Sequence, residues 1–243
     1  MFVYPQKETR DIWQAQLQIV RDAFPKFDGR KLLAVAYDDS TDEAAIDHAG
    51  WDEVQLLPNR PAQWEYPGFA WAMERLKVEP GFTVRLHSKG AVRGTPEQHL
   101  EKWWQLGFER LLDVDRVREI LERHTITGPF RRNVPAANLG VPWHYAGSLY
   151  AFRNEPIFKF GWEPVYPLLC PATHRVEAWP ALVATHNLAG SLGWDGVGDL
   201  YQAKSWGPVP IAAPAAEKPL DIPAALNPSG SAGELVLEYV GKA

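Results

Sequence analysis

Hydrophobic and polar positions follow two different rhythms along the first part of the chain, and these rhythms predict strands and helices in turn. Residues 31–37, KLLAVAY, form a near-continuous apolar run, which is typical of a parallel strand covered on both faces. Residues 9–24 place apolar side chains at helical spacing, behind Thr9 as a potential helix cap. The same patterns predict further strands at 2–4, 53–57 and 83–86, and further helices at 40–48 and 67–77.

This alternation predicts the fold class: an α/β protein with a doubly wound, mostly parallel sheet, helices on both faces and a single domain. The second half continues it less regularly. There we expect helices at 95–112, 113–123 and 174–185, strands at 126–129 and 143–153, and a loop at 131–142. Residues 206–243 are predicted to be a Pro/Ala-rich arm with a short final strand at 234–240, so that the domain spans 1–205.

Composition narrows the function classes. The chain has 243 residues and a net charge of −5, which argues against nonspecific binding to nucleic acid or to anionic membranes. No apolar run has membrane-spanning length, and residues 1–10 show no signal-peptide pattern. Cys170 is the only cysteine, which excludes an intramolecular disulfide and makes a cytoplasmic location the expectation.

A polar motif follows the strand predicted at 83–86. His87, Ser88 and Lys89 offer three hydrogen-bond donors beside Gly90, which permits a tight turn. A lysine at the end of a strand lies where open α/β sheets present side chains to a ligand. With Arg93 close by, the motif suits a phosphate-bearing ligand, although a surface turn after a core strand is an alternative interpretation.

A second polar cluster follows the strand at 31–37. Asp38 and Asp39 come directly after it, and parallel strands bring their carboxyl ends to one edge of a sheet. We therefore expect both carboxylates on the same rim as His87 and Lys89, where they can accept hydrogen bonds from a base or from ribose hydroxyls. Capping of the following helix is the alternative role, and both roles are compatible.

Several of these residues resemble one protein family. YDDSTDE at 37–43 is similar to the strand-end acidic motif of GT-A glycosyltransferases. LHSKGA at 86–91 resembles a group of GT-A-like proteins with a His-Ser/Thr-Lys-Gly motif. That group continues with a Trp-bearing helix, a His-x-Ser-Gly segment with aromatic residues, and Glu-x-Trp. This chain has, in the same order, Trp103-Trp104, His144-Tyr145-Ala146-Gly147 followed by Tyr150 and Phe152, and Glu177-Ala178-Trp179.

The resemblance implies a division of labour within the domain. Residues 1–94 would bind the nucleotide-sugar donor and residues 95–205 the acceptor. GT-A enzymes usually stabilise the leaving diphosphate with a divalent metal held by Asp-x-Asp at the end of the fourth strand. Because His87-Ser88-Lys89 stands there instead, we expect Lys89, with His87, to neutralise the diphosphate directly. An alternative is that His87 ligates a divalent ion, Mn²⁺ or Mg²⁺, shared with Asp38 or His144.

The implied reaction also needs a base for the acceptor hydroxyl. Glu177 is our first candidate and Glu163 the second, with His144 as an alternative base. His144, Tyr145 and Trp179 are the predicted acceptor-binding residues, and stacking on sugar faces competes with core packing as the role of the aromatic rings. The donor-binding set is Asp38, Asp39, His87, Ser88, Lys89 and Arg93.

We therefore expect a glycosyltransferase that moves a sugar from a nucleotide-sugar to a carbohydrate or other hydroxyl acceptor. The first candidate for the donor is a UDP-sugar. Two alternatives remain open from the sequence. One is a GT-A-like protein that binds carbohydrate or nucleotide without catalysis, consistent with the missing Asp-x-Asp. The other is a nucleotidyltransferase.

Overall fold

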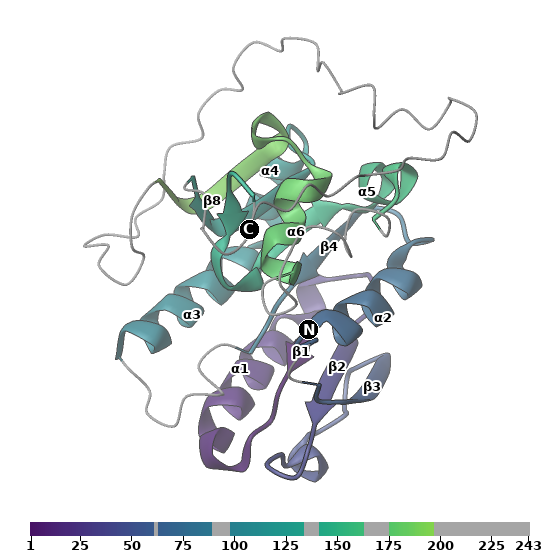
Figure 1. Ribbon diagram of the computed structural model, residues 1–243, viewed down its shortest axis with the longest axis vertical. Helices are drawn as coiled ribbons and strands as arrows, with labels where there is room; N and C mark the ends of the chain where they lie inside the picture. The colour runs from purple at the N-terminus through teal and green to yellow at the C-terminus, as the bar shows by residue number, and fades with distance from the viewer. Residues whose placement is uncertain (61–62, 89–97, 134–140, 163–174, 197–243) are drawn as a thin grey trace, which may run out of the picture. The chain divides into compact units, whose positions relative to one another are not determined.

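The computed structural model of the chain describes residues 1–60, 63–88, 98–133, 141–162 and 175–196 (Figure 1). All the described residues belong to one unit of the chain, Met1–Ile211. The predicted arm at 206–243 therefore lies outside the described residues. In the described part of the chain, no helix combines the length and the apolar character needed to cross a membrane.

A parallel three-stranded sheet forms from the first predicted strands. Its order is β1 (Phe2–Val3), β2 (Leu32–Tyr37) and β3 (Glu53–Pro58). The side chains of β2 alternate between the two faces of this sheet. Leu33 and Val35 pack in a core with Trp13 and Leu17 of α1 (Arg10–Asp22). Ala34 lies in a different core, beside α2 (Tyr66–Leu76). The run of apolar residues in β2 is thus explained by burial on both sides.

A mixed five-stranded sheet forms from the later strands. β4 (Phe82–Arg85), β7 (Tyr150–Arg153), β5 (Ile126–Arg132) and β6 (His144–Tyr145) follow one another, and β8 (Ala189–Gly196) pairs with β5. β7 is antiparallel to both β4 and β5, whereas β8 is parallel to β5.

Backbone hydrogen bonds join the two sheets edge to edge. The Phe2 amide donates to the Leu86 carbonyl at 3.0 Å, and the Ser88 amide donates to the Phe2 carbonyl at 3.0 Å. β1 therefore lies between β2 and the chain that continues β4, and it runs parallel to both. The strands follow the order β3, β2, β1, β4, β7, β5 across the joined sheets.

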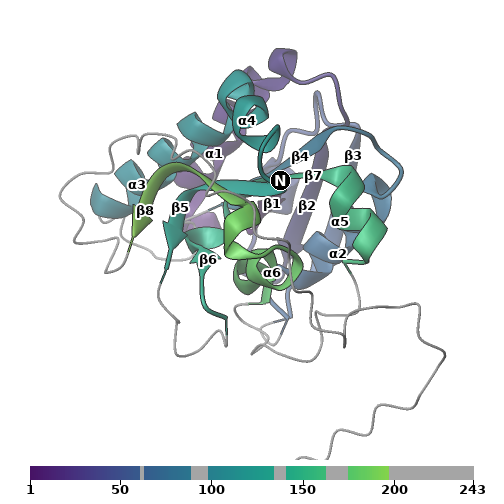
Figure 2. The ribbon, with the colours of Figure 1, turned by 90° about the horizontal axis from the view of Figure 1, so that it is seen from above.

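Helices cover both faces of the joined sheets (Figure 2). One core packs Val20 of α1 with Phe108 of α3 (Gln98–Leu111) and Ile120 of α4 (Val114–Leu121). The opposite core packs Phe69 of α2 with side chains of α5 (Asn154–Phe160) and α6 (Arg175–Val183). The α/β class and the helices on both faces agree with the prediction, but the sheet is mixed rather than mostly parallel.

Two predicted elements are wrong. The helix expected at 40–48 is a single 3₁₀ turn, Glu43–Ala45, because Ser40 and Thr41 hydrogen-bond back to Asp38 and so compete with a helix start. The strand expected at 143–153 is broken into β6 and β7 by the turn at 146–148. Gly147 and Ser148 adopt φ values of +77° and +57° there, which no strand can continue through.

Other elements were missed because their sequences carry weak signals. β8, AGSLGWDG, has no β-branched residue and three glycines, yet it forms because β5 offers a parallel edge. α5 has only seven residues and contains Pro156. Arg131 and Arg132, expected in a loop, extend β5 instead. The helix predicted at 113–123 is α4, and Asp113 caps it, since its side chain accepts a hydrogen bond from the Arg116 amide.

Candidate functional site

The first four strands all end at one edge of the joined sheets, which we call the carboxyl edge. It is formed by the residues that follow these strands: Tyr4 after β1, Asp38 after β2, Asn59 after β3, and His87 and Ser88 after β4. Their side chains form one cluster. The Tyr4 hydroxyl donates to Asp38 Oδ2 at 2.5 Å, and the Tyr4 amide donates to Ser88 Oγ at 3.2 Å. Tyr4 thus connects the two polar motifs that the sequence placed on a common rim.

Asp38 is the centre of this cluster. Asn59 Nδ2 donates to its Oδ2 at 2.7 Å, and the Ser40 amide and hydroxyl donate to its Oδ1 at 2.9 and 2.6 Å. Partial burial by itself would raise the pKa of Asp38, but the hydrogen bonds from Asn59, Ser40 and Tyr4 hold it well below its usual range. Burial and the neighbouring carboxylate raise the pKa of Tyr4. Asp38 is therefore ionised at neutral pH and Tyr4 is protonated.

Asp38 and Asp39 differ in what they offer a ligand. Four protein donors occupy the two oxygens of Asp38, which is about the number that a carboxylate accepts. The side chain of Asp39 is exposed, and none of the described residues hydrogen-bonds to its carboxylate. Asp38 accordingly organises the edge, while Asp39 has capacity to accept hydrogen bonds from a bound molecule.

A buried ion pair lies directly beneath His87. Arg85 of β4 pairs with Glu65, which precedes α2, at 2.5 Å, and both residues are 8% exposed. The Arg85 guanidinium also lies over the rings of Phe69 and Tyr150, 5.7 and 5.3 Å from their centroids. His87 Nδ1 is 3.5 Å from the same Glu65 oxygen. The pair thus ties the strand end that carries His87 to the start of α2.

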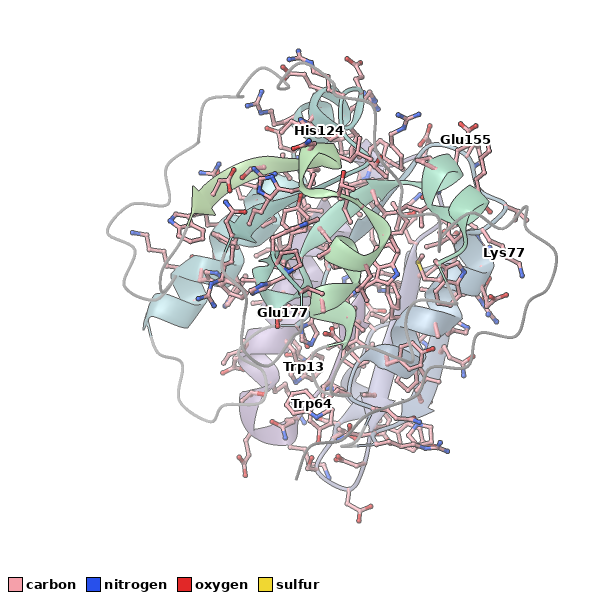
Figure 3. The ribbon with its side chains drawn as sticks, turned by 45° about the horizontal axis from the view of Figure 1, so that its top comes forward. Trp13, Trp64, Lys77, His124, Glu155 and Glu177 are labelled. Atoms are coloured by element: carbon pink, nitrogen blue, oxygen red, sulfur yellow. The ribbon has the colours of Figure 1, made fainter. Side chains whose placement is uncertain are left out.

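The turn at 146–148 is attached to this ion pair. Ser148 Oγ donates to Glu65 Oε1 at 2.6 Å, and Arg85 donates to the Ser148 carbonyl. Glu177 of α6 accepts a hydrogen bond from the Gly147 amide at 2.7 Å; Figure 3 labels Glu177 on this helix. Arg85 of β4 and Glu65, just before α2, thus hold the left-handed backbone of Ser148, and Glu177 of α6 holds the neighbouring Gly147, as is typical of strained conformations at functional sites.

The predicted acceptor residues occupy the core. His144, Tyr145 and Trp179 are 2%, 0% and 0% exposed. The Tyr145 hydroxyl donates to the Gly190 carbonyl at 2.5 Å, and burial raises its pKa far above the usual range. Trp179 stacks on Tyr150. In this structure these rings pack in the core and are not exposed to an acceptor.

The remaining predicted residues divide into two groups. Asp38, Asp39, His87 and Ser88 are brought together at the carboxyl edge. Lys89, Arg93 and Glu163 lie outside the described residues. No group of three His, Cys, Asp or Glu side chains suited to a metal ion is found within the described ranges.

Sequence reasoning missed Tyr4, Asn59, Glu65 and Arg85. Tyr4 and Asn59 directly follow the observed strands β1 and β3, but the strands were predicted at 2–4 and 53–57, so the strand-end rule did not single them out. Arg85 carried a different signal, because a charged residue inside an apolar strand requires a buried partner. Glu65 carried none, since its pairing depends on how α2 packs.

Comparison with known proteins gives this chain no relative: no family model, no curated protein and no solved structure matches it.

Proposed function

We propose that this protein is a glycosyltransferase that moves a sugar from a nucleotide-sugar donor to a carbohydrate or other hydroxyl acceptor. A UDP-sugar is the first candidate for the donor. The observation that carries the proposal is the meeting of Asp38, Asp39, His87 and Ser88 at the carboxyl edge, on either side of β1. In doubly wound folds, nucleotides bind outside the carboxyl ends of the strands where the strand order reverses. The order β3, β2, β1, β4 has that point at β1, which supports a Rossmann-like, GT-A-like fold.

The donor would contact the residues that retain hydrogen-bonding capacity. In this proposal Asp39 accepts from the base or the ribose, while Asp38 and Ser88 hold the edge in shape through Tyr4. His87 faces the diphosphate, with Lys89 and Arg93 following it in sequence. In this proposal the cationic side chain of Lys89 lies close to the leaving diphosphate and stabilises the negative charge that develops on it in the transition state.

Glu177 remains our candidate for the base that deprotonates the acceptor hydroxyl. It is half-buried, and its carboxylate accepts a hydrogen bond from the Gly147 amide at 2.7 Å. The same bond connects it to Ser148 and so to the ion pair beneath His87. Donor and acceptor residues would therefore be held in one relative geometry, as transfer in line requires.

The test combines a donor panel with a lysine substitution. Nucleotide-sugars are assayed for slow hydrolysis, and Lys89→Ala is expected to lower the rate about a hundredfold, because a charge that stabilises the leaving group contributes on the order of 3 kcal/mol. Lys89→Arg should rescue little, since its planar head changes the geometry. Lys77→Ala is the matched control. Lys77 follows the C-terminal end of α2 (Figure 3), whereas Glu65, which contacts His87, precedes its start, so the variant should retain full activity.

Three other outcomes would each favour a different function or a different source of the positive charge. Loss of wild-type activity in EDTA, with Lys89→Ala still active, would assign the charge to a divalent metal. Saturable binding of UDP without turnover of any donor would favour the binding protein without catalysis. Release of pyrophosphate from a nucleoside triphosphate would favour the nucleotidyltransferase.

A further inference from the structure

Trp64 is an exposed tryptophan with an unusual backbone conformation. The residue is 49% exposed, and its φ is +47°. A bulky residue in the left-handed region is an outlier, because its Cβ crowds the following carbonyl oxygen. Among the described residues other than glycine, only Ser148 also has a positive φ. Residues held in such conformations cluster at functional sites.

The backbone of Trp64 is held from two sides. On one side, Asn59 donates to Asp38 at 2.7 Å, and the Trp64 amide donates at 2.9 Å to the carbonyl of the residue after Asn59. On the other side, the next residue, Glu65, pairs with Arg85 at 2.5 Å. Trp64 is therefore fixed between the Asp38 cluster and the buried ion pair, at the end of α2 that lies beside the carboxyl edge.

The indole ring of Trp64 is available to a ligand. Among the described residues, none forms a ring contact or a cation–π contact with it. Trp71 of α2 differs, since Arg75 lies over its ring, 4.7 Å from the centroid. The residues on either side of Trp64 in the sequence, Gln63 and Glu65, are polar. Trp64 thus offers a single apolar surface flanked by polar residues; Figure 3 labels it at one end of α2.

This combination suits a sugar ring better than a protein surface. A pyranose has a face of C–H groups, which packs on an indole, and a rim of hydroxyls, which hydrogen-bond to polar side chains. A protein partner would need about 800 Å² of surface on each side, and a single indole ring supplies a small part of that. A nucleobase also has a flat face, so uridine is included in the test.

The contacts of Glu65 connect Trp64 with the candidate base. Ser148 Oγ donates to Glu65 at 2.6 Å, and the amide of the preceding residue, Gly147, donates to Glu177 at 2.7 Å. Trp64 and Glu177 are therefore attached to the same turn, at 146–148. A sugar stacked on Trp64 would be held in a fixed relation to the group that deprotonates the acceptor hydroxyl, as transfer in line requires.

We propose that Trp64 is the surface on which a pyranose ring of the acceptor stacks, so that the acceptor is a carbohydrate rather than another hydroxyl compound. The assignment of this sugar as acceptor rests on the proposed transferase function. Sugar binding itself needs no turnover, so the two are tested separately. The aromatic residues expected to bind the acceptor are buried, and Trp64 takes over that role.

The test titrates the full chain, with and without UDP, with cellobiose and with the methyl glycosides of glucose, galactose, mannose and N-acetylglucosamine. Binding is followed by NMR. We expect at least one sugar to bind saturably and the C–H protons of one sugar face to shift upfield, because they lie over an aromatic ring. The same sugar should shift one indole N–H signal of the protein, the signal that is missing from Trp64→Phe.

Four variants locate the site. Trp64→Ala should weaken sugar binding by about tenfold and Trp64→Phe by about threefold, because the stacking surface is lost or reduced. Trp64→Gly should also lose binding, yet melt about 2–4 °C above Trp64→Ala, since glycine adopts this φ without strain. Its loss of binding would then not reflect unfolding. Leu56→Ala, at another exposed apolar side chain, is the control and should bind as the wild type does.

The inference and the proposed function fail separately. Sugar binding at Trp64 without turnover of any nucleotide-sugar would support the inference and favour the binding protein without catalysis. Hydrolysis of a nucleotide-sugar by a protein that binds none of the five sugars would support the function and overturn the inference. The inference is also overturned if Trp64→Ala binds sugar as tightly as the wild type, or if uridine shifts the Trp64 signal and no sugar does.

Discussion

At the residue scale, Asp38 shows how one carboxylate organises a strand edge. It receives four hydrogen bonds from Tyr4, Asn59 and Ser40, which come from three different strand ends. Its aspartate neighbour, Asp39, is exposed and forms no such contacts within the described part of the chain. The sequence alone, with two adjacent aspartates after a strand, did not distinguish these roles.

We expect Asp38→Asn to lower the free energy of unfolding by about 1–2 kcal/mol at pH 7, since several hydrogen bonds to a half-buried charge are lost. The pKa of Asp38 is lowered in the folded protein, so its contribution is full above the unfolded pKa, about 3.9, and is lost as pH falls through the folded pKa. Urea unfolding of both proteins should therefore show a gap at pH 7 that narrows at pH 3. Asp39→Asn is the control, and an equal loss there would contradict this role for Asp38.

Ser148 permits a separate prediction, because its hydroxyl and its backbone contribute independently. Ser148→Ala removes the donor to the buried Glu65 and is expected to cost about 1–3 kcal/mol. Ser148→Gly loses the same hydroxyl but relieves the φ of +57°, so it should be less destabilising than alanine by about 1 kcal/mol. Thermal melts of the two variants measure the difference. Equal stability would mean that this backbone conformation carries no strain.

At the element scale, the close approach of neighbouring segments determines which residue β5 can have at position 128. A Cβ at Gly128 of β5 would lie 2.6 Å from the Tyr145 ring and 2.7 Å from the Leu149 carbonyl. This crowding explains why a glycine stands in the middle of a core strand, where it would otherwise weaken the sheet.

We expect Gly128→Ala to destabilise the protein by about 1–3 kcal/mol, because the clash involves backbone as well as a side chain. Gly29→Ala is the matched control, since nothing lies within 4 Å of its Cβ position. Chemical denaturation reports both. A Gly128→Ala variant as stable as the wild type would show that β5 can move away from Tyr145 and Leu149 without cost.

At the scale of the whole molecule, β1 connects the two sheets through the backbone hydrogen bonds between Phe2 and the residues Leu86 and Ser88. Phe2 bonds to β4 through its backbone, and its buried ring contacts Ala34 and lies 5.4 Å from the ring of His87. A residue that belongs to both sheets should affect the stability of both.

Phe2→Ala is expected to lower the free energy of unfolding by about 3–5 kcal/mol, the usual cost of removing a buried phenylalanine. Hydrogen exchange should accelerate together at Leu33 of β2 and at Ala151 of β7, because the sheets are joined through this residue. Val78→Ala, at a side chain that is 79% exposed, is the control. Faster exchange on one side alone would show that the sheets unfold independently.

The hydrophobic pattern by itself determined the elements whose burial is local and regular. β2, β3, α1, α2 and α4 were predicted close to their observed bounds, because a continuous apolar run or a helical stripe records how each element meets its neighbours. The strand-end rule also predicted that Asp38, Asp39, His87 and Lys89 share one edge, and the first three lie there, whereas Lys89 is outside the described residues.

Only the tertiary structure decided the rest, for physical reasons that act across large separations in sequence. β8 exists because β5 offers it a parallel edge, and the predicted strand 143–153 breaks because Glu65, Arg85 and Glu177 hold a left-handed turn at 146–148. The family resemblance implied that His144, Tyr145 and Trp179 bind an acceptor, but packing buries them. Residue type limits which contacts a side chain can make, whereas the fold selects which of those contacts form.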